Sequence, residues 1–158
     1  MKLLDSIAQE YPRLSDMVQH YAREKPTGPF CWEDYVGPNL RIIAAEPDKL
    51  TWEFKVDEQH CNSLGNLHGG CVATLIDICS SFAILVSSNK RQWQLIGIST
   101  DLSIAYLSGV AKDNVLRIEC EIQRVGKTLA NIFTKIYDQD NRLCYTGSHT
   151  KFNIDSRL

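Results

Sequence analysis

The sequence has little net charge and no paired-cysteine motif, and each absence argues against a class of protein. Its 158 residues carry a formal net charge of -2, so no overall attraction to nucleic acid or to an anionic membrane is expected. The 6 cysteines form no C-x-x-C pair, the spacing typical of zinc sites and redox pairs. With no signal peptide recognisable, we expect reduced thiols and a cytoplasmic or mitochondrial-matrix protein that is not secreted.

The sequence also lacks a convincing membrane span, an internal repeat and a low-complexity tract. Its longest apolar run, residues 71–86, is interrupted by Asp77 and is short for a span. The length suits one compact domain with a core. We assign it to residues 29–158, and expect residues 1–28 to form an N-terminal helical extension that Pro12 breaks or restarts.

Alternating apolar and polar residues predict a sheet. Leu50, Trp52, Phe54 and Val56 alternate with polar neighbours, the period of two expected of a strand with one buried face. The predicted strands cover residues 39–45, 50–56, 93–107, 114–125, 128–138 and 142–153. Short turns between them predict antiparallel neighbours.

A helix is predicted after Gly69-Gly70, where apolar residues recur at helical spacing as far as Val86. Because this helix is long and mostly apolar, the strands that follow must wrap it. The fold class is therefore α+β, with one long central helix on the concave face of a curved antiparallel sheet. That order suits a hotdog fold, although periodicity leaves other α+β folds open.

Two features of this helix have chemical potential. The amino terminus of a helix presents unpaired N–H groups, and Gly69 and Gly70 would let a ligand approach them closely. Such an N–H can polarise a thioester carbonyl as an oxyanion hole. Asp77 lies between apolar residues, where a carboxylate is costly unless it is paired or used as a catalytic base. The alternatives are a tight turn capped by His68 and a structural Asp77.

Helix geometry separates these two features. Nine residues divide His68 from Asp77, which corresponds to about 13 Å of rise and a rotation of about 180°. Asp77 therefore cannot act at the amino terminus of its own helix, but it could reach that of a second, antiparallel copy. We predict an obligate dimer with two shared sites, each taking Gly69 from one subunit and Asp77 from the other.

Several sequence blocks, in order along residues 40–152, resemble one family. They are Asn62-Ser63-Leu64-Gly65-Asn66-Leu67-His68-Gly69-Gly70, Asp77, Ser99-Thr100-Asp101-Leu102, Ala105-Tyr106-Leu107-Ser108, Gly126-Lys127-Thr128-Leu129-Ala130 and Gly147-Ser148-His149-Thr150-Lys151. The sequence resembles the hotdog-fold acyl-CoA thioesterases of the thioesterase superfamily member two, or acyl-CoA thioesterase thirteen, type. These belong to the phenylacetate-pathway thioesterase group.

The resemblance implies hydrolysis of fatty acyl-CoA to free acid and CoA by a homotetramer, without a metal or another cofactor. It implies that Asn62 and the Gly69 N–H hold the thioester carbonyl, that Asp77 is base or nucleophile, and that Ser99 positions water. His68 completes the implied catalytic set. The implied substrate-binding residues are Gly70, Tyr106, Arg124, Val125, Gly126, Lys127, Thr128, Leu129, His149 and Lys151, and their cations suit the phosphates of CoA.

Three other functions stay open at this stage. A hydratase on the same fold would use a similar binding surface, and a non-catalytic acyl-CoA-binding protein would keep the pocket without turnover. A third enzyme would use Cys71 as nucleophile with His68, since a helix amino terminus can lower the pKa of a thiol.

Overall fold

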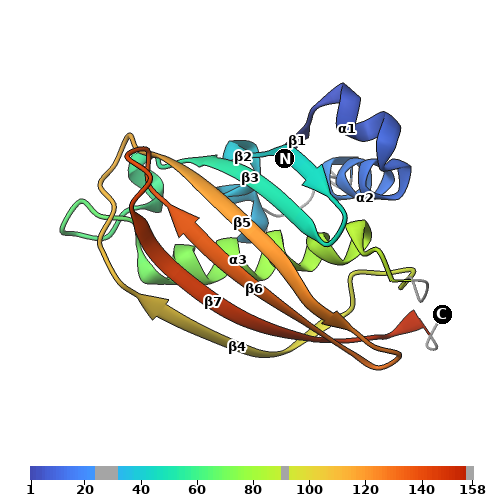
Figure 1. The fold of residues 1–158 in the computed structure, drawn as a ribbon. Helices are drawn as coiled ribbons and strands as arrows, with labels where there is room; N and C mark the ends of the chain where they lie inside the picture. Colours follow the sequence, from blue (N-terminus) through green and yellow to red (C-terminus); the bar gives the residue numbers. More distant parts are fainter. Residues whose placement is uncertain (24–31, 90–92, 156–158) are drawn as a thin grey trace.

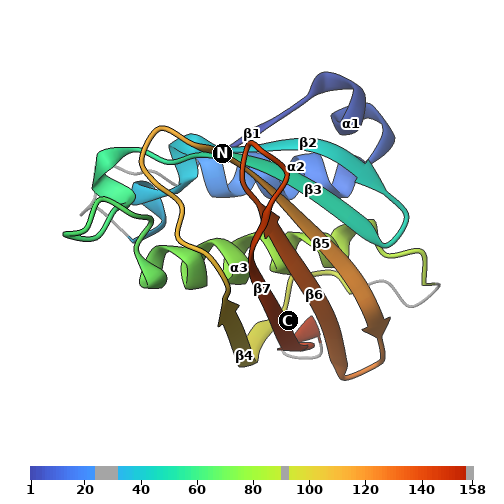
Figure 2. The ribbon, with the colours of Figure 1, turned by 60° about the vertical axis from the view of Figure 1, so that its left-hand side comes forward.

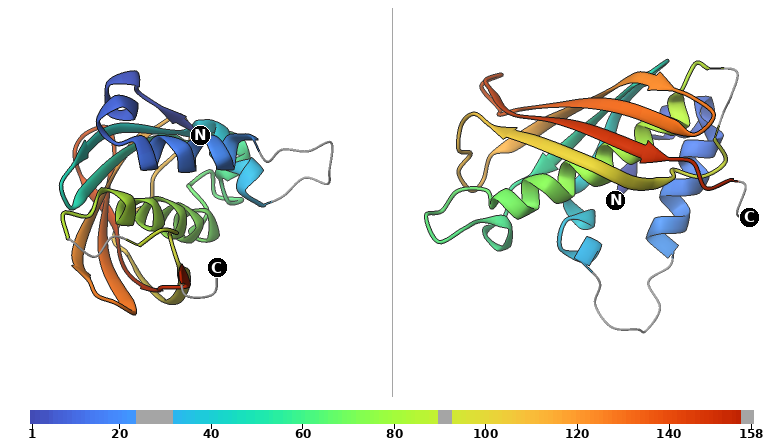
Figure 3. Two further views of the ribbon diagram at one scale, coloured as in Figure 1. Left: turned by 90° about the vertical axis from the view of Figure 1, so that its right-hand side faces the viewer. Right: turned by 90° about the horizontal axis from the view of Figure 1, so that it is seen from below.

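One long helix, held against a curved sheet, forms the centre of the computed structural model, which describes residues 1–23, 32–89 and 93–155 (Figure 1). Helix α3 spans Gly69–Ala83 and continues as the 3-10 turn η4, Ile84–Val86. The predicted helix and the predicted α+β class are therefore confirmed. Figure 3 shows the sheet curving around one side of this helix.

Seven strands form one sheet in the order β1-β2-β3-β5-β6-β7-β4. Their bounds are β1 Lys2–Leu3, β2 Leu40–Glu46, β3 Lys49–Lys55, β4 Ile98–Tyr106, β5 Val115–Val125, β6 Leu129–Tyr137 and β7 Leu143–Phe152. The predicted antiparallel hairpins β2–β3, β5–β6 and β6–β7 are confirmed. The exception is β1, which pairs with β2 in parallel and was not predicted.

Strand β4 differs from the prediction in its partner and in its start. It pairs with β7, not with β5, which follows it in the chain. The predicted strand at residues 93–107 begins only at Ile98, because the Asp155 carboxylate accepts hydrogen bonds from the N–H groups of Gln94 and Leu95. Its place at the end of the strand order makes β4 an edge strand (Figure 2), and most of its residues are exposed.

The core lies between α3 and the concave face of the sheet. Val72, Leu75 and Ile76 of α3 are fully buried, as are Trp52 and Phe54 of β3. The segment Gly69–Val86 is long and apolar enough to cross a membrane by composition, yet 67% of it is buried inside the protein. It is accordingly the core helix of this domain, as its burial under the sheet shows.

The amino-terminal helices pack on this same core. Helix α1 spans Asp5–Glu10 and α2 spans Pro12–Arg23, so Pro12 starts the second helix as predicted. Leu14 and Val18 are buried, and the Tyr21 ring packs edge-on to Phe82 of α3 at 5.2 Å. The predicted helical extension is thus part of the packed domain, and its predicted end at residue 28 lies outside the described residues.

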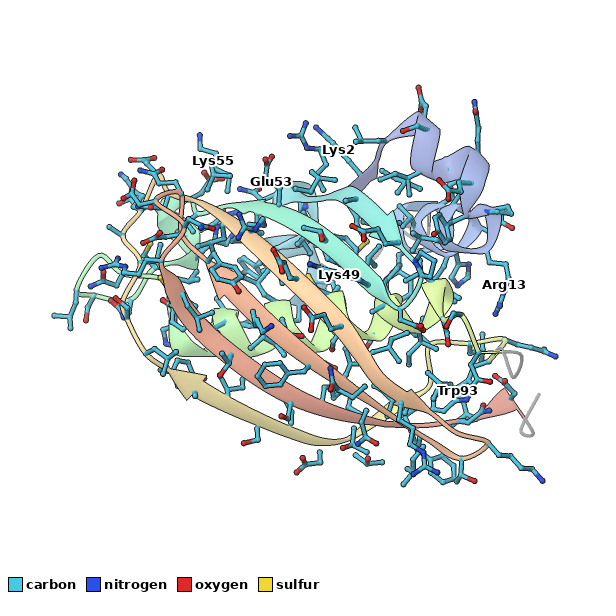
Figure 4. All side chains as sticks on the ribbon, in the orientation of Figure 1. Lys2, Arg13, Lys49, Glu53, Lys55 and Trp93 are labelled. Atoms are coloured by element: carbon cyan, nitrogen blue, oxygen red, sulfur yellow. The ribbon has the colours of Figure 1, made fainter. Side chains whose placement is uncertain are left out.

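One polar contact also ties α2 to the segment before β4. The Arg13 guanidinium donates a hydrogen bond to the Trp93 carbonyl oxygen, and Figure 4 labels both side chains at this end of the molecule. The Trp93 indole N–H in turn donates to the Gly126 carbonyl at 2.9 Å. Residues from α2, the segment before β4 and the β5–β6 turn are therefore linked.

Replacing Leu14 with alanine should show that α2 contributes to the stability of the whole domain. Leu14 is fully buried, so Leu14→Ala should lower the free energy of unfolding by about 2–5 kcal/mol. Urea denaturation measures this change, with the exposed Asp16→Ala on the same helix as control. A single transition shifted by Leu14→Ala alone is expected, whereas an unchanged midpoint would mean that α2 is not part of the core.

Candidate active site

Asp77 lies in the middle of α3, on the part of the helix that the sheet leaves open. Its side chain is 47% exposed, although Ile76 before it is fully buried. The Ser99 hydroxyl of β4 donates a hydrogen bond to Asp77 Oδ1 at 2.7 Å. The structure therefore brings together two of the predicted catalytic residues, and the carboxylate is hydrogen-bonded from one side and open on the other.

Lys151 lies behind this pair and not on the surface. Only 3% of the residue is exposed, and its ammonium donates to Ser81 Oγ at 2.8 Å and to Ser99 Oγ at 3.2 Å. The prediction of an exposed phosphate contact at Lys151 is therefore wrong in its location, because strand β7 pairs with β4 and turns this side chain inward. Burial lowers the pKa of Lys151, and the negative charge of Asp77 acts in the opposite direction.

His149, two residues earlier on β7, is buried below Asp77. Its Nδ1 lies 2.6 Å from Ser80 Oγ. Its Nε2 lies 3.4 Å from Asp77 Oδ1, without the alignment of a hydrogen bond. Burial, and then the charge of Lys151, lower the pKa of His149 to about 4, while Asp77 and Asp101 raise it. The imidazole is therefore neutral at pH 7, and a buried side chain is poorly placed for the predicted direct contact with substrate.

Ser80 and Ser81 are the residues of this cluster that sequence reasoning did not find. Both are buried, and the Ser81 hydroxyl donates to the Asp77 carbonyl oxygen at 2.6 Å. Their spacing of three and four residues from Asp77 put them on its side of the helix, but their partners on β7 are 69 or more residues away in the chain.

A second group of predicted residues gathers at the amino terminus of α3. His68 is the N-cap residue, and its Nδ1 accepts a hydrogen bond from the Gly70 N–H at 2.9 Å. This contact gives His68 the capping role that was the alternative to catalysis, and it engages the Gly70 N–H. Among the described residues no acceptor faces the Gly69 N–H, which is the group predicted to bind the thioester carbonyl.

Asn62 and Tyr106 border the same helix end. A pocket of about 360 Å³ is lined by Asn62, Gly69, Tyr106 and neighbouring residues. The Tyr106 hydroxyl donates to the Gly69 carbonyl oxygen at 3.1 Å. Asn62 Oδ1 accepts hydrogen bonds from the N–H groups of Leu64 and Asn66. The Asn62 side-chain oxygen is therefore engaged, and the NH₂ group is the part that can donate to a ligand. The pocket can offer two N–H donors to a carbonyl oxygen.

The predicted CoA-binding residues of the β5–β6 turn lie at the other end of α3. The Val125 carbonyl accepts from Asn89 Nδ2 at 2.7 Å, and the Gly126 carbonyl accepts from Trp93. Arg124, Lys127, Thr128 and Leu129 are exposed around them. Figure 1 shows this turn near the carboxyl end of α3, so one chain does not bring it together with Gly69.

The geometry of Cys71 disfavours it as a nucleophile. It is buried, and burial raises the pKa of its thiol to about 12, so the thiolate is scarce at neutral pH.

The described residues include five free thiols, which are Cys61, Cys71, Cys79, Cys120 and Cys144. Within the described ranges, no group of three His, Cys, Asp or Glu residues could hold a metal ion.

A single long helix wrapped by a curved antiparallel sheet is the arrangement of hotdog-fold proteins. The structural neighbours agree. A zebrafish thioesterase superfamily member 2 structure superposes with a TM-score of 0.75 at 29% identity, over 91% of this chain and 98% of that one. A hypothetical thioesterase from Streptococcus pneumoniae, solved with coenzyme A, superposes with a TM-score of 0.66 at 26% identity, over 74% and 87% of the two chains.

Sequence comparison gives the family. The family model for the thioesterase superfamily matches residues 64–145. Mouse acyl-coenzyme A thioesterase 13 is 36% identical over 119 residues, which are 75% of this chain and 82% of the relative. The chain belongs to the thioesterase superfamily. The zebrafish match covers 91% of this chain, so part of residues 1–28 is matched as well.

The buried His149 should make stability depend on pH. Because its pKa falls from 6.5 to about 4 on folding, its contribution is complete above pH 6.5 and is lost as the pH falls towards 4. The loss should be about 3 kcal/mol of unfolding free energy. Urea denaturation at a series of pH values should give a smaller decline for His149→Gln than for wild type. The exposed His20→Gln is the control, and equal slopes for all three proteins would contradict the prediction.

Proposed function

We propose that the protein hydrolyses fatty acyl-CoA thioesters to a free carboxylic acid and CoA. Membership of the thioesterase superfamily supports a thioester substrate. The 36% identity to a relative named acyl-coenzyme A thioesterase supports CoA as the thiol, and so does the related structure solved with coenzyme A. The observation that carries the proposal is the half-exposed Asp77 carboxylate, hydrogen-bonded by Ser99 on the open side of a core helix.

In this proposal Asp77 is the general base or the nucleophile. As a base, it takes a proton from a water that Ser99 helps to position, and the oxygen of that water attacks the thioester carbon. The C–S bond then breaks, and the CoA thiolate leaves and takes up a proton. The Asp77 oxygen that Ser99 does not engage is the natural acceptor for the proton, since a carboxylate offers two oxygens.

The Gly69 N–H and the Asn62 amide stabilise the negative charge that develops on the carbonyl oxygen. The amino terminus of α3 adds the positive end of the helix dipole. His68 supports this site by its N-cap contact with Gly70. No metal or prosthetic group has a step in this reaction.

The active site is proposed to form between two subunits, in a homodimer with shared sites. Two observations support an interface along α3 and β4: β4 is the exposed edge strand of the sheet, and Asp77 lies on the open side of α3. An antiparallel partner would bring Asp77, Ser99 and the β5–β6 turn of one subunit towards Gly69, Asn62 and Tyr106 of the other. Two such dimers would form the homotetramer implied by the resemblance.

The proposed CoA-binding surface is the β5–β6 turn with Tyr106. Arg124 and Lys127 are its exposed cations, suited to phosphate, while Val125, Gly126, Thr128 and Leu129 shape the turn.

The proposed compartment is the cytoplasm or the mitochondrial matrix. The free cysteines of the described chain support this proposal, because thiols stay reduced there.

Thiol release from acyl-CoAs of graded chain length tests the reaction. We expect wild-type turnover, a loss of about 100-fold or more in kcat for Asp77→Ala, and little change for Cys71→Ser. Retained activity in Asp77→Ala would contradict the mechanism, and loss in Cys71→Ser would favour the cysteine enzyme. No CoA release with any substrate, together with tight acyl-CoA binding, would favour the non-catalytic alternative, and addition of water to enoyl-CoA would favour the hydratase.

Mixing two inactive variants tests the shared site. Gly69→Pro removes the N–H and keeps the helical backbone, because proline is favoured at the first position of a helix and His68 has the extended backbone that precedes proline. It should cost about 10²–10³-fold in kcat. Gly69→Ala keeps the N–H, and its Cβ would meet Tyr106 at an ordinary 3.4 Å, so near-normal activity is expected.

Refolding Gly69→Pro together with Asp77→Ala should restore about one quarter of wild-type activity. Half of the dimers formed at random are mixed, and each mixed dimer has one of its two sites intact. Analytical ultracentrifugation of the active protein should find dimers or larger assemblies and no monomer. Restored activity is not expected if each site is contained in one chain, so its absence in mixed dimers would exclude the shared site.

A further inference from the structure

Lys151 is a buried cation for which the proposed reaction has no use so far. Only 3% of it is exposed, and its ammonium bonds two serine hydroxyls, on α3 and on β4. A buried ammonium is unfavourable unless neighbouring groups compensate for its lost hydration. Both of its serine partners hydrogen-bond Asp77, one through the side chain and one through the backbone.

We propose that Lys151 is a positioning residue, which orients Ser99 so that its single hydroxyl proton is directed to Asp77 Oδ1 and Asp77 Oδ2 is left for the attacking water. The role rests on the proposed thioester hydrolysis. It replaces the phosphate contact expected at this position, because the ammonium lies under the catalytic carboxylate.

The direction of the hydrogen bonds follows from the donors. A lysine ammonium has three donors and no acceptor, whereas a serine hydroxyl has one proton. Lys151 must therefore donate to Ser99 Oγ at 3.2 Å, and the Ser99 proton is free for Asp77 Oδ1 at 2.7 Å. The same reasoning applies to Ser81, which accepts from Lys151 and donates to the Asp77 carbonyl oxygen.

Both side-chain neighbours of Asp77 lie at the same carboxylate oxygen. Ser99 Oγ is 2.7 Å from Oδ1, and His149 Nε2 is 3.4 Å from it. Within the described part of the chain no group is hydrogen-bonded to Oδ2. Fixing Oδ1 therefore decides how Oδ2 is presented at the open side of α3.

Charge supports the same role. The titratable groups that face Asp77 are His149 and Lys151 on β7, and Asp101 on β4 acts on the same cluster. His149 is neutral at pH 7 and Asp101 has the same charge as Asp77. Lys151 is therefore the positively charged group beside Asp77 among these residues.

The test compares wild type, Lys151→Met, Ser99→Ala and the double variant in acyl-CoA turnover. Methionine keeps the shape without the charge or the donors. Lys151→Met should lower kcat by about 10- to 100-fold, as expected of a misplaced catalytic group, and change KM less than threefold. If Lys151 acts through Ser99, the double variant should be no worse than Ser99→Ala alone.

The controls separate this role from stability and from the reaction itself. Lys135→Met, on β6 beside Glu121, should leave kcat and KM unchanged. Thermal melts should find Lys151→Met as stable as wild type or more stable, since removing a buried charge can stabilise a protein, and Lys151→Gln is the second variant if methionine prevents folding.

A kcat of the Lys151 variants within twofold of wild type would overturn the positioning role, as would additive losses in the double variant. A rise in KM alone would also overturn it, in favour of substrate contact. Wild-type turnover that Asp77→Ala abolishes, with unaffected Lys151 variants, would leave the proposed function standing without this role. Absence of turnover in wild type would contradict both.

Discussion

One unbroken helix sets the distance between the two ends of the candidate active site. Because α3 runs unbroken from Gly69 to Ala83, its amino terminus and Asp77 stay about 12 Å apart along its axis. The sheet covers one side of the helix along this length and leaves Asp77 half exposed on another. The proposed mechanism, in which the Gly69 N–H and the Asp77 carboxylate act on one thioester, therefore requires a second helix that approaches in the opposite direction.

The Asp77 carboxylate on this apolar helix has polar neighbours on strands β4 and β7, which come later in the chain. Asp77 is next to fully buried Ile76, and its polar surroundings come from Ser99 on β4 and from His149 and Lys151 on β7. These strands are neighbours in the sheet, with Ser99 paired directly with Lys151. The strand order thus allows a carboxylate to occupy a core helix, because it places donors behind it.

Much of the fold could be predicted from local sequence pattern. The same holds for the two halves of the candidate active site, which are Asp77 and the glycines at the start of α3. The alternation in residues 50–56 and the helical period after Gly70 are local signals, and both elements are confirmed by β3 and α3. The unusual Asp77 and the glycines at the helix start are equally visible in the sequence. The pairing of β4 with β7 was not predicted, since proximity in the chain favours β5 as its neighbour.

The pairing of β4 with β7, which was not predicted, explains why the position of Lys151 was predicted wrongly. Lys151, read as a cation in a polar block, suggests a phosphate contact, and only its pairing opposite Ser99 turns it into the interior. The role of Ser81 depends on the same pairing. The packing of α2 could not be predicted from the local sequence pattern either, because an amphipathic helix does not reveal which surface its apolar side will cover.

Close packing between α3 and β7 connects the core to the chemistry. Gly147 faces Ile76, and a Cβ at Gly147 would lie 2.8 Å from Ile76 Cγ2, closer than real side chains approach. A glycine at this position therefore lets the helix lie directly on β7, one residue before Asp77. From the same strand His149 reaches Ser80, and Lys151 reaches Ser81 and Ser99. A larger residue at Gly147 would separate α3 from β7 and lengthen these contacts, so the volume of the core at Gly147 sets the geometry of the carboxylate.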